Sequence, residues 1–185
     1  MCRNMIKTPR LTLRRWREAD RKPFAALNAD PMVMEYFPEC LNRQQSDSLI
    51  EKIEAGLEER GYGLWAVQVK ATSEFIGFTG LEVPMFNASF TPAVEVGWRL
   101  ARSAWGNGYA TEAAGASLAF GFKEVGLVEV VSFTAATNMR SRAVMDRIGM
   151  IRKPDDDFDH PSLPNGHPLS RHVLYRATAP TKTRS

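Results

Sequence analysis

Hydrophobic and polar positions along the chain repeat with two different periods. One helical face between residues 43 and 60 carries apolar side chains at Leu49, Ile50, Ile53 and Leu57. Gly61 follows as a residue that ends helices. Trp65, Val67 and Val69 occupy every second position, which is typical of a strand buried on one face. These patterns predict a helix over 43–60 and a strand that follows it.

The same periods recur along the rest of the chain. They predict strands over residues 10–16, 75–83, 93–100, 129–135 and 172–177, and helices over 20–28, 109–125 and 139–148. This order predicts an α/β fold with helices packed around a mixed sheet. No repeat or linker divides the sequence, so we expect one domain over residues 1–185, with a core over about 8–178 and a mobile tail from Thr178.

Composition narrows the classes of protein that the chain can represent. Hydrophobic residues make up 44% and charged residues 24%, and the net charge of +3 is spread without a dense basic stripe, which argues against nucleic-acid binding. No apolar run approaches the roughly 18 residues that a membrane helix needs. Cys2 and Cys40 form no C-x-x-C pair and predict no disulfide framework. We expect a cytoplasmic protein, monomeric or homodimeric.

Two glycines lie where the strand over 93–100 leads into the helix that begins near Tyr109. Gly106 and Gly108 have no Cβ, so the backbone can turn with positive φ and a ligand can approach its N–H groups. The first turn of the next helix adds unpaired N–H groups and the positive end of the helix dipole. The loop therefore predicts a phosphate-binding site that needs no basic side chain.

Several kinds of loop share this glycine spacing. The nucleoside-triphosphate loop G-x-x-x-x-G-K-[ST] is absent. The dinucleotide motif G-x-G-x-x-G matches at Gly106 and Gly108, but Thr111 replaces its third glycine and half of the chain precedes the loop. A dinucleotide-binding oxidoreductase and a plain tight turn remain alternatives at this point.

A third interpretation comes from resemblance. The run from Trp105 to Ala113, WGNGYATEA, resembles motif A of the GNAT superfamily of N-acetyltransferases, although Ser103 stands where that pattern has Gln or Arg. The run from Asn138 to Met150 resembles motif B, N-x-x-S-x-x-V-M-x-x-[IL]-G-[MF], of the branch that contains the ribosomal-protein N-terminal acetyltransferases. The similarity extends over about residues 8–178.

The resemblance implies a mixed, mostly antiparallel sheet whose central strands splay apart, with helices on both faces. It implies that acetyl-CoA donates an acetyl group to a primary amine, either a protein N-terminus or a small-molecule amine. The residues that it places on acetyl-CoA are Trp98, Arg99, Leu100, Trp105, Gly106, Asn107, Gly108, Tyr109, Ala110, Asn138 and Ser141. The backbone of 98–100 would contact the pantetheine arm, whereas Trp105 and Tyr109 would mainly pack the loop.

Two residues are candidates for catalysis. Glu95 interrupts an apolar strand and is the candidate general base, with an outward-facing salt bridge as the alternative. Met145 stands where many GNAT enzymes have a tyrosine acid, so Ser141 is the candidate that protonates or holds the thiolate, unless it only bonds the local backbone. Because that tyrosine is absent, a non-catalytic acyl-CoA-binding protein on the same fold is the alternative function.

An acidic segment rich in histidine precedes the last strand. Asp157, Asp159 and His160 are expected to contact the amine acceptor, because family resemblance places this segment beside the acceptor site and carboxylates attract a cationic amine. A solvated acidic loop without a role is the alternative. The spacing of the histidines matches no common zinc motif, so no metal is expected.

Overall fold

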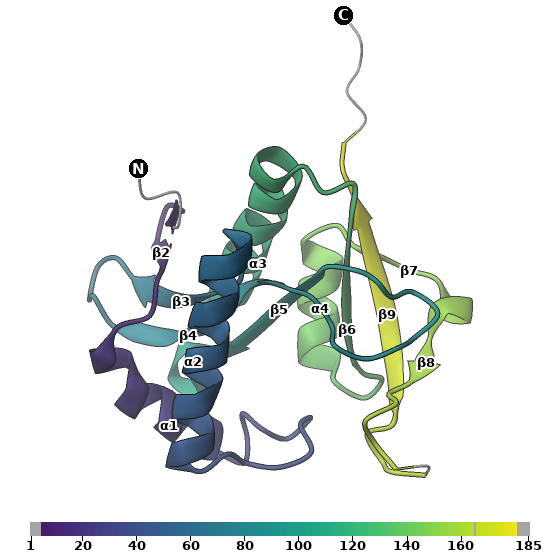
Figure 1. Ribbon diagram of the computed structural model, residues 1–185, viewed down its shortest axis with the longest axis horizontal. Helices are drawn as coiled ribbons and strands as arrows, with labels where there is room; N and C mark the ends of the chain where they lie inside the picture. The colour runs from purple at the N-terminus through teal and green to yellow at the C-terminus, as the bar shows by residue number, and fades with distance from the viewer. Residues whose placement is uncertain (1–4, 165, 181–185) are drawn as a thin grey trace, which may run out of the picture.

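The structure, a computed structural model, describes residues 5–164 and 166–180. The strands of these residues are β1 (Ile6–Lys7), β2 (Leu11–Arg14), β3 (Leu64–Val69), β4 (Phe75–Glu82), β5 (Glu95–Leu100), β6 (Glu129–Ala135), β7 (Ile151–Arg152), β8 (Phe158–Asp159) and β9 (Arg171–Thr178). The helices are α1 (Arg21–Ala29), α2 (Arg43–Arg60), α3 (Tyr109–Phe120) and α4 (Met139–Arg147). One sheet runs in the order β1-β2-β3-β4-β5-β6-β9-β7, and β8 pairs with β9 (Figure 1).

The sheet opens at its centre, between β5 and β6. This is a parallel pair, whereas the other pairs of the described strands are antiparallel. Its register consists of one position, Glu95 opposite Val131. Beside it, Val131 N donates to Val94 O at 2.8 Å and Ser132 Oγ donates to Val96 O at 2.8 Å. Beyond these contacts the strands diverge (Figure 1), which confirms the predicted mixed, mostly antiparallel and splayed sheet.

Helices cover both faces of the sheet, as predicted. On one face Phe24 of α1 packs edge-on against Phe78 of β4, with ring centroids 5.9 Å apart. On the other face Trp65 of β3 packs edge-on against Phe120 of α3, at 5.2 Å. Val96 of β5 also packs in the core that α3 and α4 share with β6 and β9. Side chains of alternate strand residues therefore point to different helical layers.

The helices follow the sequence pattern closely, with two differences. α2 spans Arg43–Arg60, with Asn42 as its N-cap and Gly61 at φ 74° after its end. The long helix expected over 109–125 is instead an α-helix to Phe120, followed by a π-helical turn at Gly121–Val125. Asp20 makes no side-chain cap bond to α1, because its buried carboxylate accepts two bonds from Arg14. Asp20 therefore forms an ion pair with Arg14 and no capping hydrogen bond to α1.

Two predictions fall wholly or partly outside the described residues. The mobile tail was expected from Thr178, but Thr178 belongs to β9 and Ala179 N donates to Val128 O at 2.9 Å; residues 181–185 lie outside the described part. Cys2 also lies outside it, and Cys40 is a free, exposed cysteine. Across the described helices, none combines the length and apolar character that crossing a membrane requires.

Candidate functional site

A cavity of about 1120 Å³ passes through the opening between β5 and β6. One end is lined by the glycine loop and the first turns of α3 and α4. The other end is lined by the α1–α2 connection, the side chains of β4 and β5 that face α1, and the segment before β9. We call these two ends the cofactor half and the acceptor half. Because the cavity joins both sides of the sheet, groups held in the two halves can meet at the opening.

The cofactor half is built mainly from backbone. Gly106 has φ 77° and Gly108, the N-cap of α3, has φ 75°, so both occupy the left-handed region that favours glycine. Trp105, Tyr109 and the two glycines line the cavity, where the N–H groups of the first helical turn and the positive dipole end favour a phosphate. The loop geometry thus fits the predicted phosphate site.

Side chains around the loop hold its shape. Trp105 Nε1 donates to Leu100 O at 2.9 Å, and the Asn107 amide donates to Ala104 O and Trp105 O, so both side chains bind protein backbone. Asn107 does not line the cavity. Glu112 accepts hydrogen bonds from Thr8 Oγ1 at 2.6 Å and from Arg10 N at 2.9 Å. The loop is therefore tied to the strands at the start of the chain.

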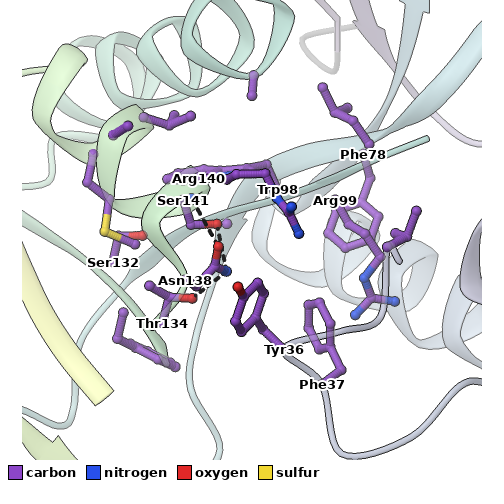
Figure 2. Close-up of a pocket in the computed structure, with 18 of the residues that line it drawn as sticks. Tyr36, Phe37, Phe78, Trp98, Arg99, Ser132, Thr134, Asn138, Arg140 and Ser141 are labelled. Carbon is purple, nitrogen blue, oxygen red and sulfur yellow. Dashed lines mark hydrogen bonds between the residues drawn. The ribbon is translucent and has the colours of Figure 1, made fainter. Parts of the chain in front are cut away.

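Asn138 and Ser141 meet at the start of α4 (Figure 2). Asn138 Oδ1 accepts from Ser141 N at 3.2 Å, and its Nδ2 donates to Ser141 Oγ at 3.1 Å and to Thr134 Oγ1 at 2.9 Å. Asn138 is thus the N-cap of α4, and the Ser141 hydroxyl keeps its own proton to donate into the cavity. Met145, where many relatives have tyrosine, is almost fully buried in the core and supplies no acid.

The edge of β5 that faces the opening offers backbone groups to a ligand. Val94 O and Val96 O point toward β6, so by strand alternation the N–H and C=O of Trp98 also point there, where β6 has moved away. Leu100 O is already bound by Trp105 Nε1. Arg99 faces the other way, because its backbone pairs with Phe78 of β4. Of the three residues predicted for pantetheine, Arg99 therefore reaches the cavity through its side chain instead.

Glu95 lies at the point where β5 and β6 separate, and its half-buried side chain lines the cavity. It stands opposite Glu82, an exposed residue at the rim. Burial, and to a lesser degree the Glu82 carboxylate, raises the pKa of Glu95 well above its usual range. A carboxyl group whose pKa is raised binds a proton more readily than an ordinary carboxylate, which suits a group that takes up a proton at the junction of the two halves.

The acceptor half contains residues that sequence patterns did not identify. Tyr36 and Phe37, from the connection between α1 and α2, line the cavity. Figure 2 shows both rings beside the residues of β5 and α4. Arg140 of α4 lies over the Tyr36 ring at 5.7 Å and pairs with Glu35 at 2.6 Å, which ties this connection to the start of α4. Nothing in their local sequence marks Tyr36 and Phe37, because they reach the cavity only through the fold.

Two histidines lie together on the wall of the acceptor half. The His160 and His172 rings have centroids 4.9 Å apart, next to Phe133 and Phe158. Burial is the main cause that lowers the pKa of both imidazoles. His160 Nδ1 accepts from Ser162 N at 3.3 Å, which leaves Nε2 to carry the proton in the neutral ring. His160 was predicted from the sequence, and the structure adds His172.

The acidic residues predicted for the acceptor are placed differently. Asp157 is nearly buried, pairs with Arg152, and its Oδ1 accepts from Leu174 N at 3.4 Å. Asp159 is 72% exposed in its side chain and lies 3.5 Å from Arg171. Neither lines the cavity. The structure therefore brings neither carboxylate into the cavity, and each lies beside an arginine of a neighbouring strand instead. No group of three possible metal ligands occurs within residues 5–164 and 166–180.

Comparison with known proteins places this geometry in a family. The sequence matches the family described as Acetyltransferase (GNAT) domain over residues 10–151. It is 35% identical over 148 residues to the uncharacterized protein YkkB of Bacillus subtilis, across 78% of this chain and 84% of that protein. It is also 35% identical over 136 residues to the FsC-acetyl coenzyme A-N(2)-transacetylase of Aspergillus fumigatus, across 68% of this chain and 57% of that protein.

Solved structures agree with this assignment. An acetyltransferase from Agrobacterium tumefaciens has 28% identity and a TM-score of 0.75, over 94% of this chain and 93% of that chain. RimL, a ribosomal-protein alpha-N-acetyltransferase in complex with coenzyme A, shares the fold with a TM-score of 0.75 at 16% identity, over 95% and 98% of the two chains. These findings replace the dinucleotide-binding alternative. The chain belongs to the GNAT family, and it is an acetyl-CoA-dependent N-acetyltransferase.

Proposed function

We propose that the protein moves the acetyl group of acetyl-CoA to a primary amine by direct attack, at the opening between β5 and β6. The observation that carries this proposal is the single cavity that joins the glycine loop to Glu95 through the sheet. The amine nitrogen forms a bond to the thioester carbonyl carbon, the carbon–sulfur bond breaks, and CoA leaves as a thiolate. One proton is lost from the amine and one is gained by the thiolate.

The backbone of 105–110 would hold the pyrophosphate, since its free N–H groups and the α3 dipole favour an anion. The free N–H and C=O of Trp98 would bind the amides of the pantetheine arm. The loop also fits this ligand sterically. A Cβ at Gly106 would meet no protein atom within 4 Å, so the space next to the glycine is open to a ligand.

Glu95 is the residue that we propose as general base, directly or through a water molecule. An α-amino group has a reference pKa near 8 and a lysine one near 10.4, so the amine needs to lose a proton before it attacks. The raised pKa of Glu95 brings its proton affinity closer to that of the amine. Its position where the strands separate places it between the two halves.

Ser141 is the residue that we propose to act on the sulfur. Its Oγ accepts from Asn138 Nδ2 at 3.1 Å, which orients the hydroxyl and leaves its proton free. A thiol has a reference pKa near 8.5, so a hydrogen bond suffices to stabilise the leaving thiolate before it is protonated. Asn138 would position Ser141 rather than react itself.

The acceptor would enter from the side of Tyr36 and His160. One relative is named as a transacetylase of the N2 position of FsC, and RimL is named as an alpha-N-protein acetyltransferase. These names support an amine as the acceptor. A peptide N-terminus and a small-molecule amine are both consistent with them. His160 would face the acceptor as a neutral ring. We expect the reaction to take place in the cytoplasm.

The test is turnover with a panel of amines. The purified protein is mixed with acetyl-CoA and with peptides that have free N-termini, short amino acids, polyamines and aromatic amines, and release of the CoA thiol is followed with a thiol reagent. Acceptors whose amine is already acetylated are the matched controls. Thiol release that requires a free amine, confirmed by the mass of the acetylated product, supports the proposal.

The opposing result is also clear. Tight acetyl-CoA binding by calorimetry without thiol release across the whole panel would favour the non-catalytic acyl-CoA-binding alternative.

A further inference from the structure

Arg99 is a half-buried cation whose charge the proposed reaction leaves unexplained. Its guanidinium lies over the Phe37 ring at 4.0 Å and the Phe78 ring at 5.3 Å from the centroids. NH1 donates to Asn28 Oδ1 at 2.7 Å, whereas the buried Nε has no partner in the described part of the chain. Figure 2 shows the side chain beside Phe37, among the residues that line the cavity.

Within the described part of the chain Arg99 makes no ion pair, although the Glu82 carboxylate acts on it at longer range and opposes the lowering of its pKa by burial. Among residues 5–164 and 166–180, the cavity-lining Arg10 and Arg140 have carboxylate partners, whereas Arg99 and Arg147 have none. Burial lowers the pKa of Arg99 to about 10, so the group is still a cation at neutral pH. A desolvated guanidinium with unused donors is a site that favours an anion, above all a planar carboxylate.

The strands set this cation at a fixed distance from the proposed base. On the face toward α1, β4 and β5 present three successive pairs: Glu82 with Glu95, Gly80 with Gly97, and Phe78 with Arg99. The acids form one end of the row and the guanidinium forms the other. Arg99 lies four positions after Glu95 on β5, which corresponds to about 13 Å between their Cα atoms.

Gly97, which lines the cavity, keeps the space between the two ends clear. A Cβ at Gly97 would meet only Glu95 Oε1, at 3.8 Å, so the missing side chain leaves open cavity. The register of β4 and β5 continues through Gly97 without a bulge. A short ligand can therefore lie along β5 from Glu95 to Arg99.

We propose that the acceptor is a short, extended molecule with its amine at the Glu95 end and a carboxylate that binds Arg99. This inference rests on the proposed function, because it assumes that the acceptor occupies this half. The phosphates of CoA do not explain the site, since the glycine loop and α3 lie on the opposite face of β5. A free α-amino acid is too short, because its amine and carboxylate share one carbon atom. A tripeptide or an ω-amino acid spans the row.

Two matched probes test the charge directly. Trialanine and trialanine amide have the same amine and nearly the same shape, and differ in the terminal carboxylate. We expect kcat/KM for thiol release to be at least tenfold higher with trialanine. Binding of both probes to the CoA complex is measured by calorimetry as well, because that measurement does not require turnover.

Variants then assign the preference to this residue. Arg99→Met keeps an apolar stem on Phe37 and removes the charge, and should abolish the preference for trialanine without changing acetyl-CoA affinity. Arg99→Lys keeps the charge without the planar fork and should retain a smaller preference. Arg43→Met removes one exposed positive charge that does not line the cavity, and should behave like the unmodified protein.

The outcomes separate this inference from the proposed function. Turnover without a preference for the carboxylate, or equal binding or no binding of the two probes, overturns the inference. A preference that persists in folded Arg99→Met also overturns it, as does a loss of acetyl-CoA affinity in that variant. Binding that prefers trialanine without any thiol release supports the anion site and contradicts the proposed reaction.

Discussion

The cofactor half and the acceptor half of the cavity are built from different parts of the chain. The cofactor half uses contiguous backbone, from Trp105 to the first turn of α3, and its neighbours Asn138 and Ser141 lie three residues apart. The acceptor half uses side chains from distant segments, with Phe37, Arg99 and His160 each on a different element. Binding by backbone depends on φ and on the lack of a Cβ, whereas binding by side chains depends on their identity.

This difference has a functional consequence. A site made of backbone groups binds one ligand and tolerates changes in most of the surrounding side chains. It can therefore stay the same among proteins that all bind acetyl-CoA. Side chains at separate positions can change one at a time, and each change alters which acceptor fits.

The largest effect is expected where the halves meet. Glu95→Gln keeps the shape of the side chain and removes the base, so kcat near neutral pH should fall about 100-fold. The loss should shrink as the pH rises above the pKa of the amine, because the free amine no longer needs a base. The pH dependence of kcat with one acceptor measures this. A loss of equal size at every pH would mean that Glu95 positions the acceptor instead.

Stability provides the control for this variant. Burial raises the pKa of Glu95 in the folded state, so its contribution to stability is full below the unfolded pKa, near 4.5, and is lost as the pH rises through the folded value. Because glutamine does not ionise, the stability of Glu95→Gln should not fall with pH for this reason. Denaturant unfolding at pH 5 and pH 8 should show a variant at least as stable as the unmodified protein at pH 8, which excludes unfolding as the cause of a rate loss.

The second effect concerns the cofactor half. Gly108→Val puts a branched side chain at φ 75° where the loop should meet the pyrophosphate, and acetyl-CoA affinity should fall at least tenfold, or about 1.4 kcal/mol. Gly126→Val is the matched control, because Gly126 has φ 81° and open surroundings but lies at the far end of α3. Calorimetry with both variants separates backbone strain from lost binding. Equal affinity in the two folded variants would remove the loop from the site.

The third effect is smaller and concerns the thiol end. Ser141→Ala should lower kcat several-fold with unchanged acetyl-CoA affinity, since the proposed contact strengthens only as the thiolate forms. Asn138→Ala is the companion variant, and should also cost about 1 kcal/mol of folding stability through the lost cap. Steady-state rates and binding are measured where chemistry limits turnover. Full kcat in Ser141→Ala would leave that residue a purely structural role.

The contrast between the halves also explains which features the sequence could predict. The sheet, the helices and the glycine loop follow from local period, glycine positions and two contiguous motifs, so α2 was predicted at its observed bounds. The π-helical turn after Phe120 has no comparable local signal. Tyr36, Phe37 and the side-chain direction of Arg99 depend on how separate elements pack, and a single sequence does not encode those distances in any local pattern.

The acidic segment is a second case in which local sequence did not reveal contacts between separate elements. Asp157 and Asp159 suggested recognition of a cation because carboxylates without visible partners attract one. Their partners Arg152 and Arg171 lie 5 and 12 residues away in sequence, and β9 brings both arginines to this segment. Charge composition suggested a binding role, and the sequence pattern did not reveal that both carboxylates lie beside arginines outside the cavity.

The smallest effect on catalysis is expected from Asp157→Asn, which should leave the acceptor KM unchanged. Its cost should appear in stability instead, at about 1–2 kcal/mol at pH 7, because the nearly buried carboxylate loses charged bonds to a partly exposed Arg152. The Arg152 hydrogen bond lowers the pKa of Asp157, so this stability is present above the unfolded value near 3.8 and is lost as the pH falls through the folded value. The free energies of unfolding in urea of the variant and the unmodified protein should therefore differ at pH 7 and converge in strong acid.

Asp159→Asn, at an exposed carboxylate, should change stability by less than about 0.5 kcal/mol. A raised acceptor KM in either variant, with a normal fold, would mean that the acidic segment does contact the acceptor.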